Sequence, residues 1–110
     1  MSLTLKDLIA EFGVKNIDKE CSDEDILAFK DFCDPWEEVG TALRLNAADI
    51  SAIAEDHRIA SLRRLGVLQK WKSKFAFKAT YRALITALLE CNKGDKARQV
   101  YRILAQKTGN

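Results

Sequence analysis

Apolar residues recur at helical spacing along nearly the whole chain, and this pattern constrains the fold more than any other feature of the sequence. The first example is the i, i+3, i+4, i+7 set Leu5, Leu8, Ile9 and Phe12, which is the spacing of a helix with one face against a core. The chain contains one proline and five glycines, so few residues interrupt helices. No segment of useful length alternates apolar and polar residues as a strand does. The sequence therefore predicts an all-α protein.

Six further helical segments are predicted from Ser22 onward, and several begin at recognisable N-caps. Ser22, Asn46 and Thr80 have the residue type and position of an N-cap. Asp34 is predicted to act in the same way, with Pro35 at the first helical position. The inward-facing stripes of the six segments are Ile26, Phe29 and Cys33; Trp36, Val39, Gly40 and Leu43; Ile50, Ile53 and Ala54; Leu62, Leu65, Leu68, Trp71 and Phe75; Tyr81, Leu84, Ile85, Leu88 and Leu89; and Ala97, Val100, Tyr101 and Leu104.

The connections between these segments are short. Residues 14–21 are predicted to link the first amphipathic segment to the six that follow, and residues 91–95 are predicted to form a turn. Short connections of this kind are typical of a compact helical bundle. No apolar stretch approaches the roughly 20 residues that a membrane-spanning helix needs, so we expect no membrane insertion.

The sequence lacks the motifs on which catalysis or cofactor binding commonly depends. It has no G-x-S-x-G elbow, no glycine-rich phosphate loop and no H-E-x-x-H pair. Cys21, Cys33, Cys91 and the single histidine, His57, do not have the spacing of a zinc site. The cysteines are interpreted as reduced thiols of a cytoplasmic protein, with Cys33 and Cys91 as small core residues. We therefore expect no enzyme, no cofactor and no metal.

Charge is distributed unevenly along the chain, although the net charge is only +2. Residues 1–57 carry fourteen acidic and five basic residues, a balance of −9, whereas residues 58–110 carry thirteen basic and two acidic residues, a balance of +11. A basic half can bind phosphate backbones, but the acidic half of the same small domain would repel them. The charge pattern thus favours a protein partner over a nucleic acid.

Four segments, in this order and spacing, resemble the death domain. They are Asp-Pro-Trp-Glu-Glu-Val-Gly-Thr-Ala-Leu-Arg-Leu (34–45), Asn-Ala-Ala-Asp-Ile-Ser-Ala-Ile (46–53), Arg-Leu-Gly-Val-Leu-Gln-Lys-Trp (64–71) and Ala-Thr-Tyr-Arg-Ala-Leu-Ile-Thr-Ala-Leu (79–88). Residues 25–33 are also similar to death-effector domains, and caspase-recruitment domains share the fold, so both subfamilies remain alternatives. Trp71 favours the death-domain branch.

The resemblance implies a six-helix antiparallel Greek-key-like bundle of the death-fold type with an extra amphipathic N-terminal segment. Residues 22–107 would form the death domain and residues 108–110 a tail. Residues 1–21 would be an N-terminal extension, either an extra helix or part of a split first helix.

The resemblance further implies an adaptor that binds other death-fold domains through homotypic contacts in intracellular signalling, including apoptosis. The predicted acidic patch on the second and third helices comprises Glu37, Glu38, Asp49, Glu55 and Asp56. The predicted basic patch on and around the fourth helix comprises Arg58, Arg63, Arg64, Lys70, Lys72, Lys74 and Lys78. Two unlike patches join copies head to tail, so salt-sensitive self-association is expected. A nucleic-acid-binding helical domain and a spacer or intramolecular docking domain stay open as alternatives.

Overall fold

The computed structural model describes residues 3–14 and 16–108, and within these residues the secondary structure is helical apart from one isolated β-bridge between Glu20 and Thr80. Seven α-helices and two short 3-10 helices are present there: α1 (Leu5–Phe12), α2 (Asp23–Phe29), η1 (Lys30–Phe32), α3 (Trp36–Ala42), α4 (Ala47–Asp56), α5 (Ala60–Phe75), η2 (Ala76–Lys78), α6 (Tyr81–Glu90) and α7 (Gly94–Thr108). The predicted all-α fold, with six helices after Ser22 and a helical leader, is confirmed.

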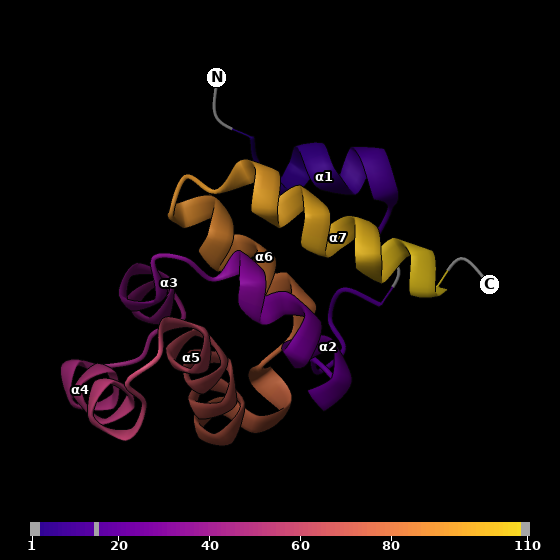
Figure 1. The fold of residues 1–110 in the computed structure, drawn as a ribbon. Coiled ribbons are helices and arrows are strands. Elements are labelled where there is room, and N and C mark those ends of the chain that lie inside the picture. The colour runs from indigo at the N-terminus through magenta and orange to yellow at the C-terminus, as the bar shows by residue number, and fades with distance from the viewer. Residues whose placement is uncertain (1–2, 15, 109–110) are drawn as a thin grey trace.

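The helices form two groups that share one core (Figure 1). In the first group α5 contacts α2, α3 and α4, so α5 is the central helix of that half. In the second group α6 and α7 pack on each other across a short turn, and α1 lies along α7 although the two are at opposite ends of the chain (Figure 1). Contacts between α3 and α6 join the two groups.

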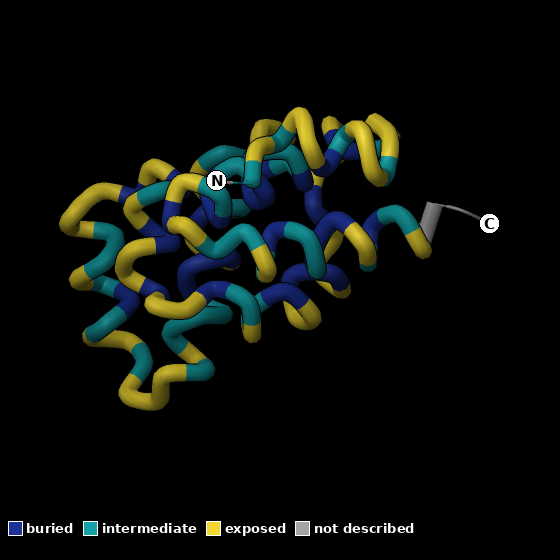
Figure 2. Tube along the Cα trace, turned by 90° about the horizontal axis from the view of Figure 1, so that it is seen from above, coloured by how far each residue is buried: buried dark blue, intermediate teal, exposed yellow. Residues whose placement is uncertain are grey.

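The core follows the apolar stripes of the sequence, and Figure 2 shows buried positions interspersed with exposed ones along the chain. Both tryptophans are core residues, with Trp36 8% and Trp71 2% exposed, as predicted. Ile17, in the connection between α1 and α2, is also fully buried. The largest side chains that are fully buried include Tyr101, Phe29, Leu8, Ile17, Leu68, Leu84, Ile85 and Leu88.

Three of the predicted N-caps are confirmed. The side-chain oxygens of Ser22, Asn46 and Thr80 each accept a hydrogen bond from the backbone N–H three residues later. At Asn46 the bond is reciprocal, because the Asp49 carboxylate accepts from the Asn46 backbone N–H at 3.0 Å. Such caps stabilise a helix start by satisfying N–H groups that have no partner within the helix.

Three local predictions are wrong. Asp34 is not the N-cap of α3: Pro35 holds that position with an extended backbone, and no side chain caps this helix. Asp95 lies inside α7 and not in the preceding turn. Leu62 does not face the core and is 43% exposed, because six residues at about 100° each place it about 120° around α5 from the buried Leu68.

Gly40 sets how closely α3 and α4 approach. A Cβ atom at this position would lie 2.7 Å from Cδ1 of Ile50, closer than two carbon atoms pack. The absence of a side chain at Gly40 therefore lets Ile50 of α4 reach the surface of α3, which positions the two helices that carry the predicted acidic patch.

Candidate interaction surfaces

Arg63 connects the start of α3 to the end of α4. Its Nε donates to the backbone oxygen of His57 at 2.6 Å, and its Nη2 donates to the backbone oxygen of Ala54 at 3.1 Å. The guanidinium carbon lies 5.6 Å from the ring centroid of Trp36, within the range of a cation–π contact. Arg63 was predicted to bind a partner, but in the structure two of its donors bond to backbone oxygens at the end of α4.

This arrangement brings four of the five predicted acidic residues to one end of the α3–α4 pair. Glu37 and Glu38 lie in the first turn of α3, whereas Glu55 and Asp56 end α4. All four are exposed, and within the described part of the chain none of them forms an ion pair. We refer to Glu37, Glu38, Glu55 and Asp56 as the acidic surface.

Asp49, the fifth predicted acidic residue, lies among lysines. It is at the start of α4, where its carboxylate accepts from Lys74 Nζ at 2.6 Å and lies 3.9 Å from Lys70 Nζ. The hydrogen bond from Lys74, followed by that from the Asn46 backbone, holds the pKa of Asp49 below its usual range. Asp49 therefore belongs with the positive charges of α5 and not with the acidic surface.

The predicted basic residues are dispersed around α5. Lys72 pairs with Asp23 at 3.1 Å and with Glu20 at 3.4 Å on the α2 side of the helix. Arg64 is partly buried, and its Nε has no hydrogen-bond partner in the described structure.

The four exposed cations of this predicted patch occupy three places. Arg58 precedes α5, two residues beyond Asp56, whereas Lys78 lies in η2 beyond the other end of α5. Lys70 and Lys74 flank Asp49. Because Lys70, Lys74 and Lys78 belong to the C-terminal half of α5 and its extension, we refer to these three residues as the lysine surface.

We expect the Arg63→Ala variant to be less stable than the wild type by about 1–2 kcal/mol, because two backbone carbonyls at the end of α4 lose a charged donor and Trp36 loses its cation contact. Urea denaturation followed by circular dichroism measures this difference. The matched control is Arg58→Ala, whose exposed side chain makes no ion pair among the described residues, so its unfolding free energy should match that of the wild type. Equal stability of Arg63→Ala and Arg58→Ala would contradict the structural role of Arg63.

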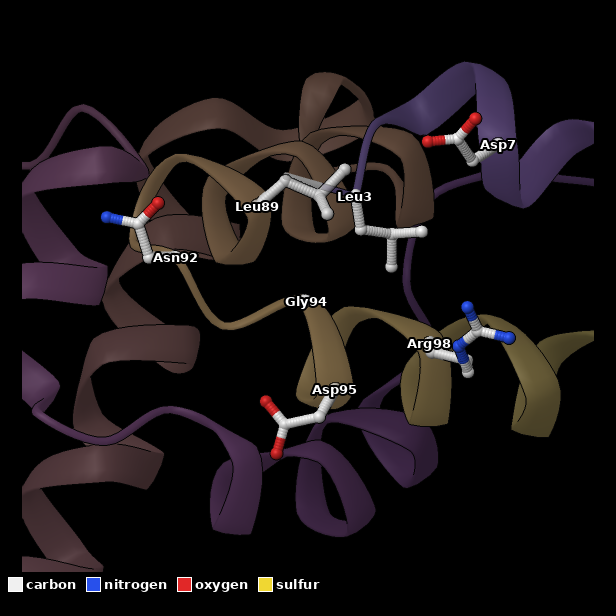
Figure 3. Close-up of a pocket in the computed structure, with 7 residues that line it drawn as sticks. All are labelled: Leu3, Asp7, Leu89, Asn92, Gly94, Asp95 and Arg98. Atoms are coloured by element: carbon white, nitrogen blue, oxygen red, sulfur yellow. The ribbon is translucent and has the colours of Figure 1, made fainter. Parts of the chain in front are cut away.

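The surface of the described residues includes two hollows of interest. The first, about 730 Å³, separates α1 from the α6–α7 turn and is lined by Leu3, Asp7, Leu89, Asn92, Gly94, Asp95 and Arg98. Figure 3 shows Leu3 beside Leu89, with Asp7 on α1 and Arg98 on α7. Asp7 is part of the capping box of α1, and Arg98 binds Glu11 at 2.5 Å. Of the charged residues of this hollow, Asp7 therefore stabilises the start of α1 and Arg98 links α1 to α7.

The second hollow is a groove of about 310 Å³ where the ends of α3 and α5 meet α6. Its apolar floor includes Trp71 and Phe75, and its rim carries Arg44, Lys78 and Arg82. Sequence reasoning missed this groove, because its lining combines residues from three helices that are far apart along the chain.

The three cysteines are buried and unpaired. Burial raises the pKa of the Cys21 and Cys33 thiols to about 12, and burial also raises the pKa of Cys91. A thiol is nucleophilic as the thiolate, so these residues pack as small apolar side chains. The interpretation of Cys33 and Cys91 as core residues is confirmed.

The six helices from α2 to α7 define a helical interaction module, and comparison with known families identifies its type. The death-domain family matches residues 23–104. The chain belongs to the death-domain family, whose members are non-enzymatic modules for homotypic protein–protein interaction. No curated protein and no solved structure gives a significant match. None of the helices in residues 3–14 and 16–108 has the length and apolar character of a membrane span.

Proposed function

We propose that this death domain acts as a cytoplasmic signalling adaptor that joins other death-fold domains head to tail, with the acidic surface of one domain against the lysine surface of the next. The observation that carries the proposal is that four exposed acidic residues without ion pairs in the described chain lie at the start of α3 and the end of α4, the two helix ends that Arg63 contacts. Membership of the family supports the choice of partner.

The two surfaces lie far enough apart to act independently. Lys74 is eleven residues beyond Arg63 on α5, which corresponds to about 16 Å along the helix axis. An interface between two different patches does not close into a two-fold dimer, so it can add further subunits. Complementary charges on the two surfaces accelerate the encounter of two domains and select the orientation in which they bind. Each exposed pair contributes only about 0–1 kcal/mol, so several pairs must act together.

Light scattering on a sizing column tests the proposal. At about 0.01 M salt, where charges interact over about 30 Å, we expect the wild type to form oligomers that dissociate at about 1 M salt, where that range falls to about 3 Å. The Glu55→Ala/Asp56→Ala variant should stay monomeric at low salt. It should fold at least as stably as the wild type, because acidic residues at a helix C-terminus oppose the helix dipole. A monomeric wild type at low salt would contradict the proposal.

Two further variants make the experiment specific. Asp95→Ala removes an exposed acidic charge from α7, away from both surfaces, and should assemble as the wild type does. Lys70→Ala/Lys74→Ala disables the lysine surface and should be monomeric alone. Mixed with Glu55→Ala/Asp56→Ala it should form a one-to-one dimer, because each variant keeps the surface that the other lacks. A mixture that remains monomeric would rule out the head-to-tail contact.

A further inference from the structure

The groove between α3, α5 and α6 has an apolar floor that is open to solvent. Trp71, Leu43 and Ala87 are themselves buried, whereas Phe75 and Ala83 are partly exposed within it. At about 310 Å³, the groove lies at the lower end of the size range of ligand pockets and has room for a branched aliphatic side chain. It is therefore suited to one anchoring side chain of a protein.

The rim of the groove is positively charged. Arg44 is exposed and lies 3.6 Å from Glu90, which is the acidic residue of the lining. Arg82 binds Asp18 outside the groove at 2.6 Å. Lys78 is exposed and has no ion pair in the described structure. Because Arg44 and Arg82 each face a carboxylate, Lys78 is the rim cation that has no ion pair in the described structure, and its charge favours an acidic partner.

The exposed side of α2 and η1 has the opposite character. Leu27 is 55% exposed, although a leucine is more often buried. Glu24 lies three residues before it and Asp31 four residues after it, and both are exposed. Glu24 and Leu27 lie on one face of α2, whereas Asp31 follows in η1, beyond the end of α2. Asp31 is 3.2 Å from Lys30, and Glu24 has no ion pair in the described structure. The face thus presents a leucine between acidic residues.

We propose that the groove receives Leu27 of a second copy of this chain. The leucine side chain packs on the partly exposed Phe75 and Ala83, while Glu24 and Asp31 lie toward Arg44 and Lys78. Leu27 is not among the residues that line the groove of its own molecule, so the contact is intermolecular.

The chain therefore carries both halves of a contact that differs from the one between the acidic and lysine surfaces. Its two halves are unlike, so it adds subunits in one direction and does not close a two-fold dimer. It does not rest on the acidic surface, and it shares only Lys78 with the lysine surface. The anchor is a single side chain, so the contact is weak by itself and gains strength when a second contact holds the same two molecules together.

Nuclear magnetic resonance with one labelled and one unlabelled copy tests this inference. Both copies carry Glu55→Ala/Asp56→Ala, which removes the acidic-surface contact and keeps the two proposals separable. Adding unlabelled protein should shift the backbone amide signals of the labelled groove residues Ala83, Thr86 and Ala87. When the unlabelled copy also carries Leu27→Ala, the apparent affinity should fall by about tenfold or more, because the anchoring side chain no longer buries its apolar surface.

The reciprocal experiment tests whether the contact joins Leu27 of one copy to the groove of the other. A labelled copy that carries Leu27→Ala keeps its own groove, so unlabelled protein with Leu27 intact should still shift its groove signals. An unlabelled copy with Leu62→Ala is the matched control, since it removes another exposed leucine and should bind as before. Groove signals that do not shift, or that shift equally with the Leu27→Ala copy, would overturn the proposal. Equal shifts with the Leu27→Ala copy would mean that another segment of the second copy occupies the groove.

Discussion

The Leu8→Ala variant is expected to be less stable than the wild type by about 3 kcal/mol, the typical cost of removing most of a fully buried leucine side chain and leaving a cavity. Leu8 is 0% exposed and belongs to α1, which packs on α7 and α6. Urea denaturation measures the change. Val14→Ala is the control in the same segment, because Val14 is exposed and its loss should change the unfolding free energy by less than about 0.5 kcal/mol.

The large effect is expected because α1 is held at several points. The rings of Phe12 and Tyr101 stack with centroids 5.2 Å apart, and the Tyr101 hydroxyl donates to the backbone oxygen of Gly13. The family match begins at residue 23, yet α1 covers the α6–α7 pair. Leu8→Ala with the stability of the wild type would show that this extension does not contribute to the folded domain.

The second large effect is expected at Tyr81. Its hydroxyl donates to the carboxylate of Asp25, a residue that is only 3% exposed, and it accepts from the Ser22 backbone N–H at 3.4 Å. Burial, followed by the hydrogen bond to Asp25, raises the pKa of Tyr81, so the hydroxyl keeps its proton. Tyr81→Phe removes this donor from a buried carboxylate and should destabilise the domain by about 2–3 kcal/mol.

A double-mutant cycle separates the pair from its surroundings. Asp25→Leu, Tyr81→Phe and the double variant are compared by thermal and urea denaturation. Because Tyr81→Phe has its effect by leaving the carboxylate without this donor, it should cost much less in the Asp25→Leu background. Equal costs in both backgrounds would show that the hydroxyl and the carboxylate are not energetically coupled.

Much of the fold could be predicted because it depends on neighbours in sequence. The caps at Ser22, Asn46 and Thr80 join residues three positions apart, and such local bonds can be read from residue type. The inward stripes follow from 3.6 residues per turn. The prediction at Leu62 is wrong because steps of three residues rotate around the helix, so Leu62 lies about 120° from the buried Leu68 and is 43% exposed.

The interaction surfaces were harder to predict because an unpaired charge is a property of its three-dimensional surroundings. Asp49 is neutralised by Lys74 across 25 positions of sequence. Arg63 is occupied by the carbonyls at the end of α4. Both residues carry the charge that the sequence pattern required, but the structure assigns them to internal contacts. The roles of the acidic and lysine surfaces in binding stay predictions.

The sequence by itself determined that this chain is helical, where most of its helices begin, and that it resembles the death domain, because periodicity and capping act over a few residues. Only the tertiary structure decided that Asp25 is buried against Tyr81, that α1 belongs to the packed domain, and that a basic-rimmed groove forms between α3, α5 and α6. Each of these depends on side chains that meet from distant parts of the chain, and their meeting is set by how whole helices pack.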